Sequence, residues 1–198
     1  MRCTSRWGWG VLALALWGPV LAGPFEESNS AFRRGDISTA MEFLVPLAEQ
    51  GDVRAQMNLG TLNYNAATPN YEAAAKWFRL AAEQGEALAE RYLGYMYANG
   101  QGVARDDREA VKWYGRAAEQ GDADAQAGLA AMYSAARGTS QNYVQAHKWF
   151  SVAASRYPAS ERAKRAQAIR SSQLLAEKMS PSEVEEARKQ AREWQPKS

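Results

Sequence analysis

The chain has 198 residues, of which 46% are hydrophobic and 23% are charged, and its formal net charge is +2. An aromatic content of 11% excludes a disordered chain, while one Cys and one His exclude thiolate zinc sites and most other transition-metal sites. The 38 Ala residues, against two Ile and nine Val, favour helix over strand and predict an all-α protein.

The N-terminal segment has the pattern of an export signal. Arg2 and Arg6 precede an uncharged apolar run from Trp7 to Ala22. We predict a secretory signal peptide over residues 1–22, cleaved after Ala22. The alternative is a retained membrane anchor, but a run of about 15 residues is shorter than the roughly 20 that span a bilayer.

Cleavage would also change the charge balance of the chain. It would remove Arg2 and Arg6 and leave 22 basic and 22 acidic residues. A formal net charge of zero gives no basis for a nucleic-acid partner. We therefore expect a periplasmic or secreted protein with no nucleic-acid partner and no stable membrane span after cleavage.

An internal repeat dominates the remaining sequence. An Ala-Glu-Gln-Gly motif recurs at spacings of 34 and 36 residues, and a Lys-Trp-aromatic triplet recurs every 36 residues. These motifs begin at Ala48, Ala82 and Ala118, and at Lys76, Lys112 and Lys148. Each period divides into two amphipathic helices, which in the middle copy are expected over 87–98 and 107–120. Gly121 is expected to end the second helix with a positive φ.

Small and large residues at fixed repeat positions predict how the helices pack. We expect small residues to face the paired helix within a hairpin, and tryptophans to fill the space between stacked hairpins. The small residues are Gly60, Gly94 and Ala130, and the tryptophans are Trp77, Trp113 and Trp149.

The middle copy carries a specific set of motifs. They are Leu93-Gly94-Tyr95-Met96-Tyr97, Gly100-Gln101-Gly102-Val103, Trp113-Tyr114 and the run from Ala117 to Gly121. In these residues the sequence resembles the Sel-like repeat (SLR), a subclass of the tetratricopeptide repeat superfamily found in exported bacterial proteins. The first copy lacks the Gly-x-Gly-Val element, and the third keeps one of its two glycines, in Arg137-Gly138-Thr139. The resemblance implies a right-handed α-solenoid of antiparallel helical hairpins.

The chain is expected to divide into a leader, two caps and a repeat array. The expected segments are the signal peptide 1–22, an N-terminal capping hairpin 23–51, three repeats at 52–85, 86–121 and 122–157, and C-terminal capping helices with a short tail at 158–198. Ser180-Pro181-Ser182-Glu183 predicts a capping box that starts the last helix. The caps would cover the open ends of the solenoid.

No combination of residues predicts catalysis, a metal site or a cofactor. His147 is the only histidine, and it aligns with Ala75 and Val111 in the repeat, which favours a structural role. Asp106 and Asp107 stand where a helix begins, so capping accounts for them. We therefore expect a protein that is not an enzyme.

The superfamily geometry implies that the first helix of each hairpin lines the concave side of the solenoid. The candidate partner-binding groove there consists of Arg54, Met57, Thr61, Tyr64, Asn65, Leu88, Arg91, Tyr95, Asn99, Asp124 and Ser134, with the small Ala127 and Ala131 in the third copy. That nearly bare third copy has room for a partner helix or for the chain's own cap. The alternative for each single residue is a merely solvated helix face.

The resemblance implies an exported adaptor or scaffold that binds a peptide or protein partner in cell-envelope assembly or regulation. One alternative is a protein that binds or hydrolyses cell-wall fragments or β-lactams. SLR proteins linked to those ligands carry paired cysteines, which this chain lacks. A further alternative is a structural spacer that self-associates through its basic tail and acidic body. For the adaptor we expect a monomer.

Overall fold

The computed structural model describes residues 23–197, and the predicted signal peptide lies outside this range. The described residues form ten α-helices and no strand, which confirms the predicted all-α class. The helices are α1 (Pro24–Arg33), α2 (Ile37–Glu49), α3 (Val53–Asn65), α4 (Tyr71–Glu83), α5 (Ala87–Asn99), α6 (Asp107–Gln120), α7 (Ala123–Ser134), α8 (Tyr143–Arg156), α9 (Arg162–Ala176) and α10 (Pro181–Glu193).

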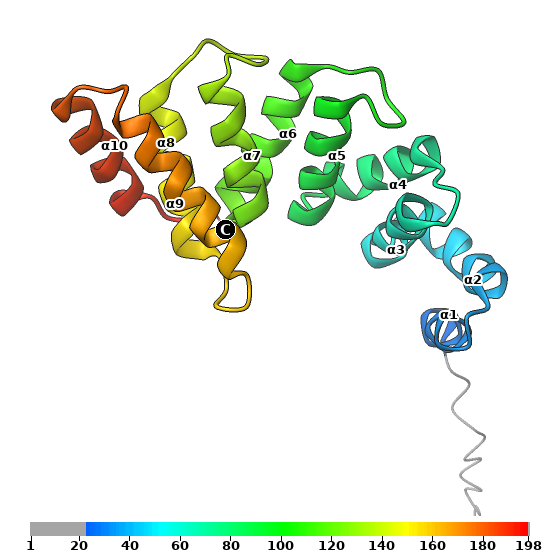
Figure 1. The fold of residues 1–198 in the computed structure, drawn as a ribbon. Coiled ribbons are helices and arrows are strands. Elements are labelled where there is room, and N and C mark those ends of the chain that lie inside the picture. Colours follow the sequence, from blue (N-terminus) through cyan, green and yellow to red (C-terminus); the bar gives the residue numbers. More distant parts are fainter. Residues whose placement is uncertain (1–22, 198) are drawn as a thin grey trace, which may run out of the picture.

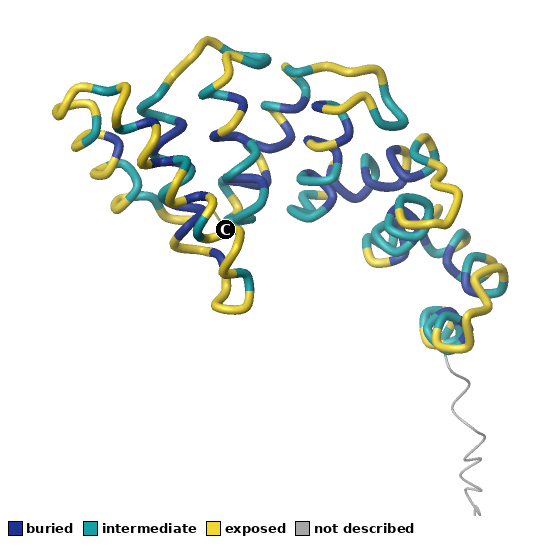
Figure 2. The backbone as a smooth tube through the Cα atoms, in the orientation of Figure 1, coloured by how far each residue is buried: buried dark blue, intermediate teal, exposed yellow. Residues whose placement is uncertain are grey.

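The first eight helices form four hairpins that stack one after another. Each helix from α1 to α8 packs mainly against the helix before it and the helix after it, and the chain follows an arc (Figure 1). Buried positions lie where neighbouring helices meet, whereas the loops and much of α9 and α10 are exposed (Figure 2). Contacts restricted to sequence neighbours are typical of a solenoid, and the α-solenoid predicted from the repeat is confirmed.

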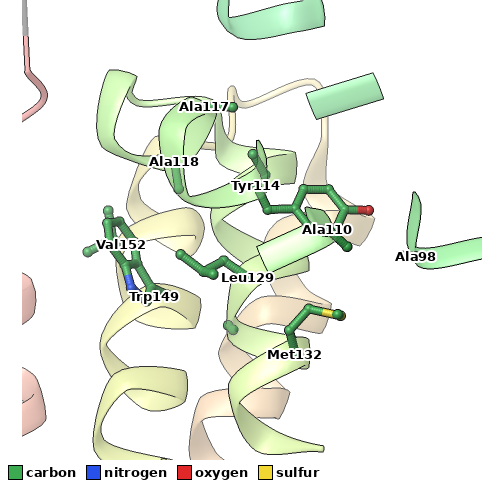
Figure 3. Packing of buried hydrophobic residues seen from close by; sticks show 11 residues of the cluster. Ala98, Ala110, Tyr114, Ala117, Ala118, Leu129, Met132, Trp149 and Val152 are labelled. Carbon is green, nitrogen blue, oxygen red and sulfur yellow. The ribbon is translucent and has the colours of Figure 1, made fainter. Parts of the chain in front are cut away.

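The Lys-Trp-aromatic triplet joins successive hairpins. Trp77 on α4 packs backward into a buried cluster with Leu44 and Leu59, while Phe78 packs forward into a cluster with Leu93 of α5. The same division recurs further along, where Tyr114 of α6 and Trp149 of α8 share one core (Figure 3). The three repeat tryptophans are at most 8% exposed, so the prediction that they lie between stacked hairpins is confirmed.

The glycines at one position of the first two repeats have a steric role. A Cβ atom on Gly60 would lie 2.5 Å from Cε1 of Phe78, and one on Gly94 would lie 2.7 Å from Cδ1 of Tyr114. At such distances the aromatic ring would have to shift to admit a side chain. Both glycines face the paired helix of their own hairpin, as predicted.

The connectors inside the second and third repeats, which are the third and fourth hairpins, each depend on a glycine. Gly102 has a φ of 65° and Gly138 a φ of 67°, in the left-handed region. A Cβ on Gly102 would clash with the backbone of Tyr71, and one on Gly138 would clash with the backbone of Asp107. The single glycine that the third copy retains is therefore the one that its close backbone approach requires.

Short polar side chains cap most of the helices. Oδ1 of Asp106 accepts hydrogen bonds from the backbone N–H groups of Arg108 and Glu109 at 2.9 and 3.1 Å, which confirms its predicted capping role. The capping box that begins at Ser180 is present. Gly100 and Gly121 end α5 and α6 in the left-handed conformation, as expected for Gly121.

A buried amide ties the first and third repeats to the helix before them. Nε2 of Gln56 donates to the carbonyl oxygen of Ala48 at 3.0 Å, and Nε2 of Gln126 donates to the carbonyl oxygen of Ala118 at 3.0 Å. Both glutamines are at most 2% exposed. Each of these carbonyls lies in the last turn of its helix and also accepts from the backbone N–H of Gly51 or Gly121, so the glutamine adds a second donor from the next helix.

The middle repeat makes the same connection with different residues. Glu90 occupies the equivalent position and is 0% exposed, but its side-chain carboxylate has no N–H to donate. Arg116 of α6 replaces the missing donor: its guanidinium donates to the carbonyl oxygen of Ala82 at 3.0 Å, and its Nε lies 2.7 Å from Oε1 of Glu90. Gln120 donates to the second carboxylate oxygen of Glu90 at 2.8 Å. Burial raises the pKa of Glu90, and the Arg116 charge opposes this shift.

The C-terminal cap differs from the preceding hairpins. Both α9 and α10 pack against α8, so the two helices cover it together instead of pairing mainly with each other (Figure 1). Trp194, directly after α10, contacts Trp149 with 5.8 Å between ring centroids. The tail then returns to α6, where the backbone N–H of Lys197 donates to the carbonyl oxygen of Glu119 at 2.8 Å.

Candidate functional site: the face of α3, α5 and α7

A pocket of about 360 Å³ lies on the face of the first helices and is called the central pocket here. Its walls come from α3, α5, α6, α7 and α9. It is lined by Tyr64, Arg91, Tyr92, Tyr95, Tyr114, Asp124 and Lys164. Helices from three repeats and the C-terminal cap therefore build one site.

The structure distributes the predicted groove residues over several places. Tyr64, Arg91, Tyr95 and Asp124 meet in the central pocket. Thr61 and Asn65 line a second pocket of about 550 Å³ beside Phe32 and Ile37, called the N-terminal pocket. Asp124 also borders a third pocket of about 460 Å³ between α7 and α9, together with the small Ala127 and Ala131. The chain's own α9 thus lies over the nearly bare third copy.

Five predicted groove residues lie outside these three pockets: Arg54, Met57, Leu88, Asn99 and Ser134. The Arg54 guanidinium lies 4.4 Å from the ring centroid of Phe25. Asn99 and Ser134 donate hydrogen bonds to carbonyls of their own helices, at 2.8 and 3.0 Å. Met57 is half-buried against the core between α4 and α5, and Leu88 is half-buried at the start of α5.

Stacked aromatic rings make one wall of the central pocket rigid. The Tyr64 ring lies 5.3 Å from both Tyr71 and Tyr92, and Tyr92 stacks on Phe78 at 4.5 Å with 4° between the ring planes. Burial raises the pKa of the Tyr64 hydroxyl, so it stays protonated as a hydrogen-bond donor. Tyr95 is the exception, since 43% of it is exposed. It is therefore the residue of this wall most open to a partner.

An ion-pair network forms the opposite side of the pocket. The Arg91 guanidinium lies 3.2 Å from Asp122 and 2.7 Å from Asp124, and Lys164 of α9 lies 2.9 Å from Asp124. The hydroxyl of Tyr157 also donates to Asp124 at 3.0 Å. Burial raises the pKa of Asp122, and the hydrogen bond from the Ala125 backbone N–H and the Arg91 charge oppose this shift only in part. Arg91 and Asp124 thus hold α5, α7 and the cap together as well as lining the site.

The sequence analysis missed three residues of the central pocket. Tyr114 stands out in the sequence only as part of a repeat motif, although it also borders the pocket. The signal for Tyr92 was present, because the equivalent positions in the other copies hold the smaller Asn58 and Gly128. Lys164 had no local signal, since it reaches the site only because α9 packs back onto α8.

Other candidate residues have structural roles in the described part of the chain. His147 is 4% exposed, and burial lowers its pKa. Asp107 pairs with Arg137 at 2.6 Å. Within residues 23–197 no group of three or more His, Cys, Asp or Glu is placed to hold a metal ion. None of the helices in that range combines the length and apolar character that crossing a membrane requires.

Stacked hairpins that present such a surface define an α-solenoid of the kind that serves as a protein-interaction scaffold. The Sel1 repeat family model matches residues 53–86, 87–122 and 123–157, and the chain belongs to the Sel1 repeat family. Proteins with this repeat are typically non-catalytic interaction scaffolds. No curated protein matches the sequence.

Solved structures of bacterial proteins have the same fold. The SLR-fold protein c5321, a protective antigen of uropathogenic Escherichia coli, is 28% identical with a TM-score of 0.68 over 79% of this chain and 32% of its own. The Sel1 repeat protein from Oxalobacter formigenes is 29% identical with a TM-score of 0.61, covering 79% of this chain and 71% of its own. Cysteine rich protein B of Helicobacter pylori is 25% identical with a TM-score of 0.50, over 63% and 91%. This chain thus spans about a third of the E. coli protein.

Proposed function

We propose that this protein is an exported adaptor that holds a peptide or protein partner on the face of α3, α5 and α7. The partner would belong to the assembly or regulation of the cell envelope. The carrying observation is the central pocket, in which side chains from three repeats and the cap converge. The expected export rests on the signal-peptide pattern of residues 1–22.

The chemistry of the pocket suits a polypeptide. Tyr64, Tyr92 and Tyr95 offer broad apolar ring faces with polar edges, and tyrosines often carry much of the binding energy at interfaces. The stacked Tyr92 and the packed Tyr64 lose little freedom on binding, which lowers the entropic cost of association. An exposed Tyr95 beside this rigid wall provides an anchor for a partner side chain.

The proposal is tested by capture from a cell-envelope extract with the immobilised protein. Tyr95→Ala is the test variant, because Tyr95 is 43% exposed and truncating it leaves the core intact. Leu174→Ala is the matched control, since Leu174 is an exposed hydrophobic residue of α9, 59% exposed, that lines none of the three pockets. Circular dichroism establishes that both variants keep the fold.

We expect the parent and Leu174→Ala to capture the same protein, and Tyr95→Ala to lose at least 90% of it, because an interface hot spot contributes about 2 kcal/mol or more. Equal capture by all three would contradict the proposed binding face.

Two further measurements test the expected export and the expected monomer. Mass spectrometry of the exported protein tests signal-peptide cleavage, with Gly23 expected at the N-terminus. Light scattering at several salt concentrations tests the expected monomer against a self-associating spacer.

A further inference from the structure

A fourth pocket, of about 450 Å³, lies between α8 and α10 and is called the arginine pocket here. It is lined by Ser151, Val152, Ser155, Arg156, Arg188, Ala191, Arg192, Trp194, Gln195 and Pro196. None of these residues borders the central pocket, so the two sites are separate. The arginine pocket has three guanidinium groups and no carboxylate in its lining.

The positive charge of this pocket is only partly compensated. Arg192 lies 2.8 Å from Glu185, in a pair whose side chains are both more than 60% exposed. Within residues 23–197, Arg156 and Arg188 have no carboxylate at ion-pair distance. The carboxyl ends of α8 and α10 contribute about half a negative charge each. A net positive charge remains at the pocket.

The three arginines are exposed, and an aromatic contact positions one of their guanidinium groups. The Arg156 guanidinium lies 5.3 Å from the ring centroid of Trp194, which holds it against the pocket wall. Arg188 is close enough to α8 for its charge to help lower the pKa of His147, after burial. Arginines from two helices therefore face a common space, with the Ser151 and Ser155 hydroxyls beside them.

We propose that the arginine pocket binds a ligand through an oxyanion group, of which phosphate is the simplest. Guanidinium groups bind oxyanions through paired N–H donors with charge-assisted hydrogen bonds. The pocket is larger than a single ion needs, so the remaining volume beside Val152, Ala191 and Trp194 would take an apolar part of the same ligand. This assigns a small-ligand site to the cap of a protein whose partner is proposed to bind elsewhere.

Isothermal titration of the full-length chain with inorganic phosphate and, separately, with succinate tests the proposal at constant ionic strength. The test variant carries Arg188→Gln and Arg192→Gln, leaving Arg156 and its contact with Trp194 in place. The control variant carries Arg162→Gln and Arg165→Gln, two exposed arginines of α9 outside the pocket. The two variants lose the same charge, so they separate a site from a general charge effect.

We expect saturable binding by the parent and the control, and a loss of about tenfold or more in the association constant in the test variant, since it removes two charge-assisted contacts. The stronger of the two probes identifies the oxyanion as phosphate-like or carboxylate. An Arg188→Lys, Arg192→Lys variant should bind with intermediate affinity, because it keeps the charge but loses the paired donors. Absence of binding by the parent, or equal loss in the test and control variants, would overturn the proposal.

Discussion

Replacing Arg116 with Leu tests whether Arg116 and Glu90 together make the connection in the middle repeat that Gln56 makes alone in the first. Leu80 occupies the equivalent place in the first repeat, so the side chain fits the array. The change would leave the 0% exposed carboxylate of Glu90 without the cation that lies 2.7 Å from it, and the Ala82 carbonyl without its side-chain donor. Breaking a fully buried ion pair from one side costs about 3–5 kcal/mol. The Arg116 side chain is 42% exposed and Gln120 still donates to Glu90, so we expect a smaller loss of about 1–3 kcal/mol in the free energy of unfolding.

The second half of the experiment adds Glu90→Gln to Arg116→Leu. The double variant recreates the arrangement of Gln56 and Leu80, in which the amide itself donates to the preceding carbonyl. Both charges disappear together, so we expect a stability within about 1 kcal/mol of the parent. Urea denaturation followed by circular dichroism measures all variants, and the double-mutant cycle gives the coupling between the two positions.

Two results would refute this reasoning. A loss below about 1 kcal/mol in Arg116→Leu would mean that water or another residue satisfies Glu90 without the ion pair. A double variant as unstable as the single one would mean that the amide cannot take over the hydrogen bond to Ala82. Either result would show that the glutamine and arginine arrangements are not interchangeable.

Three other predictions concern stability. Burial raises the pKa of Glu90 in the folded protein, so ionising this carboxyl costs more free energy in the folded than in the unfolded state. The stability that protonated Glu90 contributes is therefore fully present below the unfolded-state pKa and is lost as the pH rises through the folded-state pKa. Glu90→Gln should weaken that fall, measured by urea denaturation between about pH 4 and 7, and an unchanged pH profile would contradict it. Gly94→Ala should lower the free energy of unfolding by about 1–3 kcal/mol, because its Cβ would lie 2.7 Å from the Tyr114 ring. Thermal unfolding checks this against the control Gly115→Ala, a half-buried helix position where a Cβ meets no atom within 4 Å. Trp149→Ala should cost about 3–5 kcal/mol by denaturant titration, and a loss below about 1 kcal/mol would argue against its central place in the core.

The repeat architecture could be predicted from sequence because each of its causes is local. A period of about 36 residues, a glycine opposite an aromatic ring and a short polar N-cap before most helices all act within one hairpin or between adjacent ones. Gly94 and Asp106 illustrate this, since their contacts lie within their own repeat. Such features appear in the sequence at fixed spacing.

The candidate site could be predicted only in part, because some of the contacts that form it join residues that are distant in the sequence. The first-helix positions gave Tyr64, Arg91, Tyr95 and Asp124, which meet in the central pocket. They did not give Lys164, which lies 40 residues from Asp124 and reaches it through the packing of α9 on α8. The placement of a non-repeating cap depends on tertiary contacts that no periodicity records.

The return of the tail to α6 has a consequence for how the array unfolds. In a solenoid each unit touches only its neighbours, so the last unit can detach alone and the rest can unzip stepwise. Here the Lys197 backbone donates to Glu119 at 2.8 Å, and the Lys197 side chain lies 3.3 Å from the Glu119 carboxylate. Fraying of α10 must break a link to a helix that is not its neighbour. The tail therefore links the C-terminal end of the array back to α6, and we expect the helices from α6 to α10 to lose hydrogen-exchange protection together.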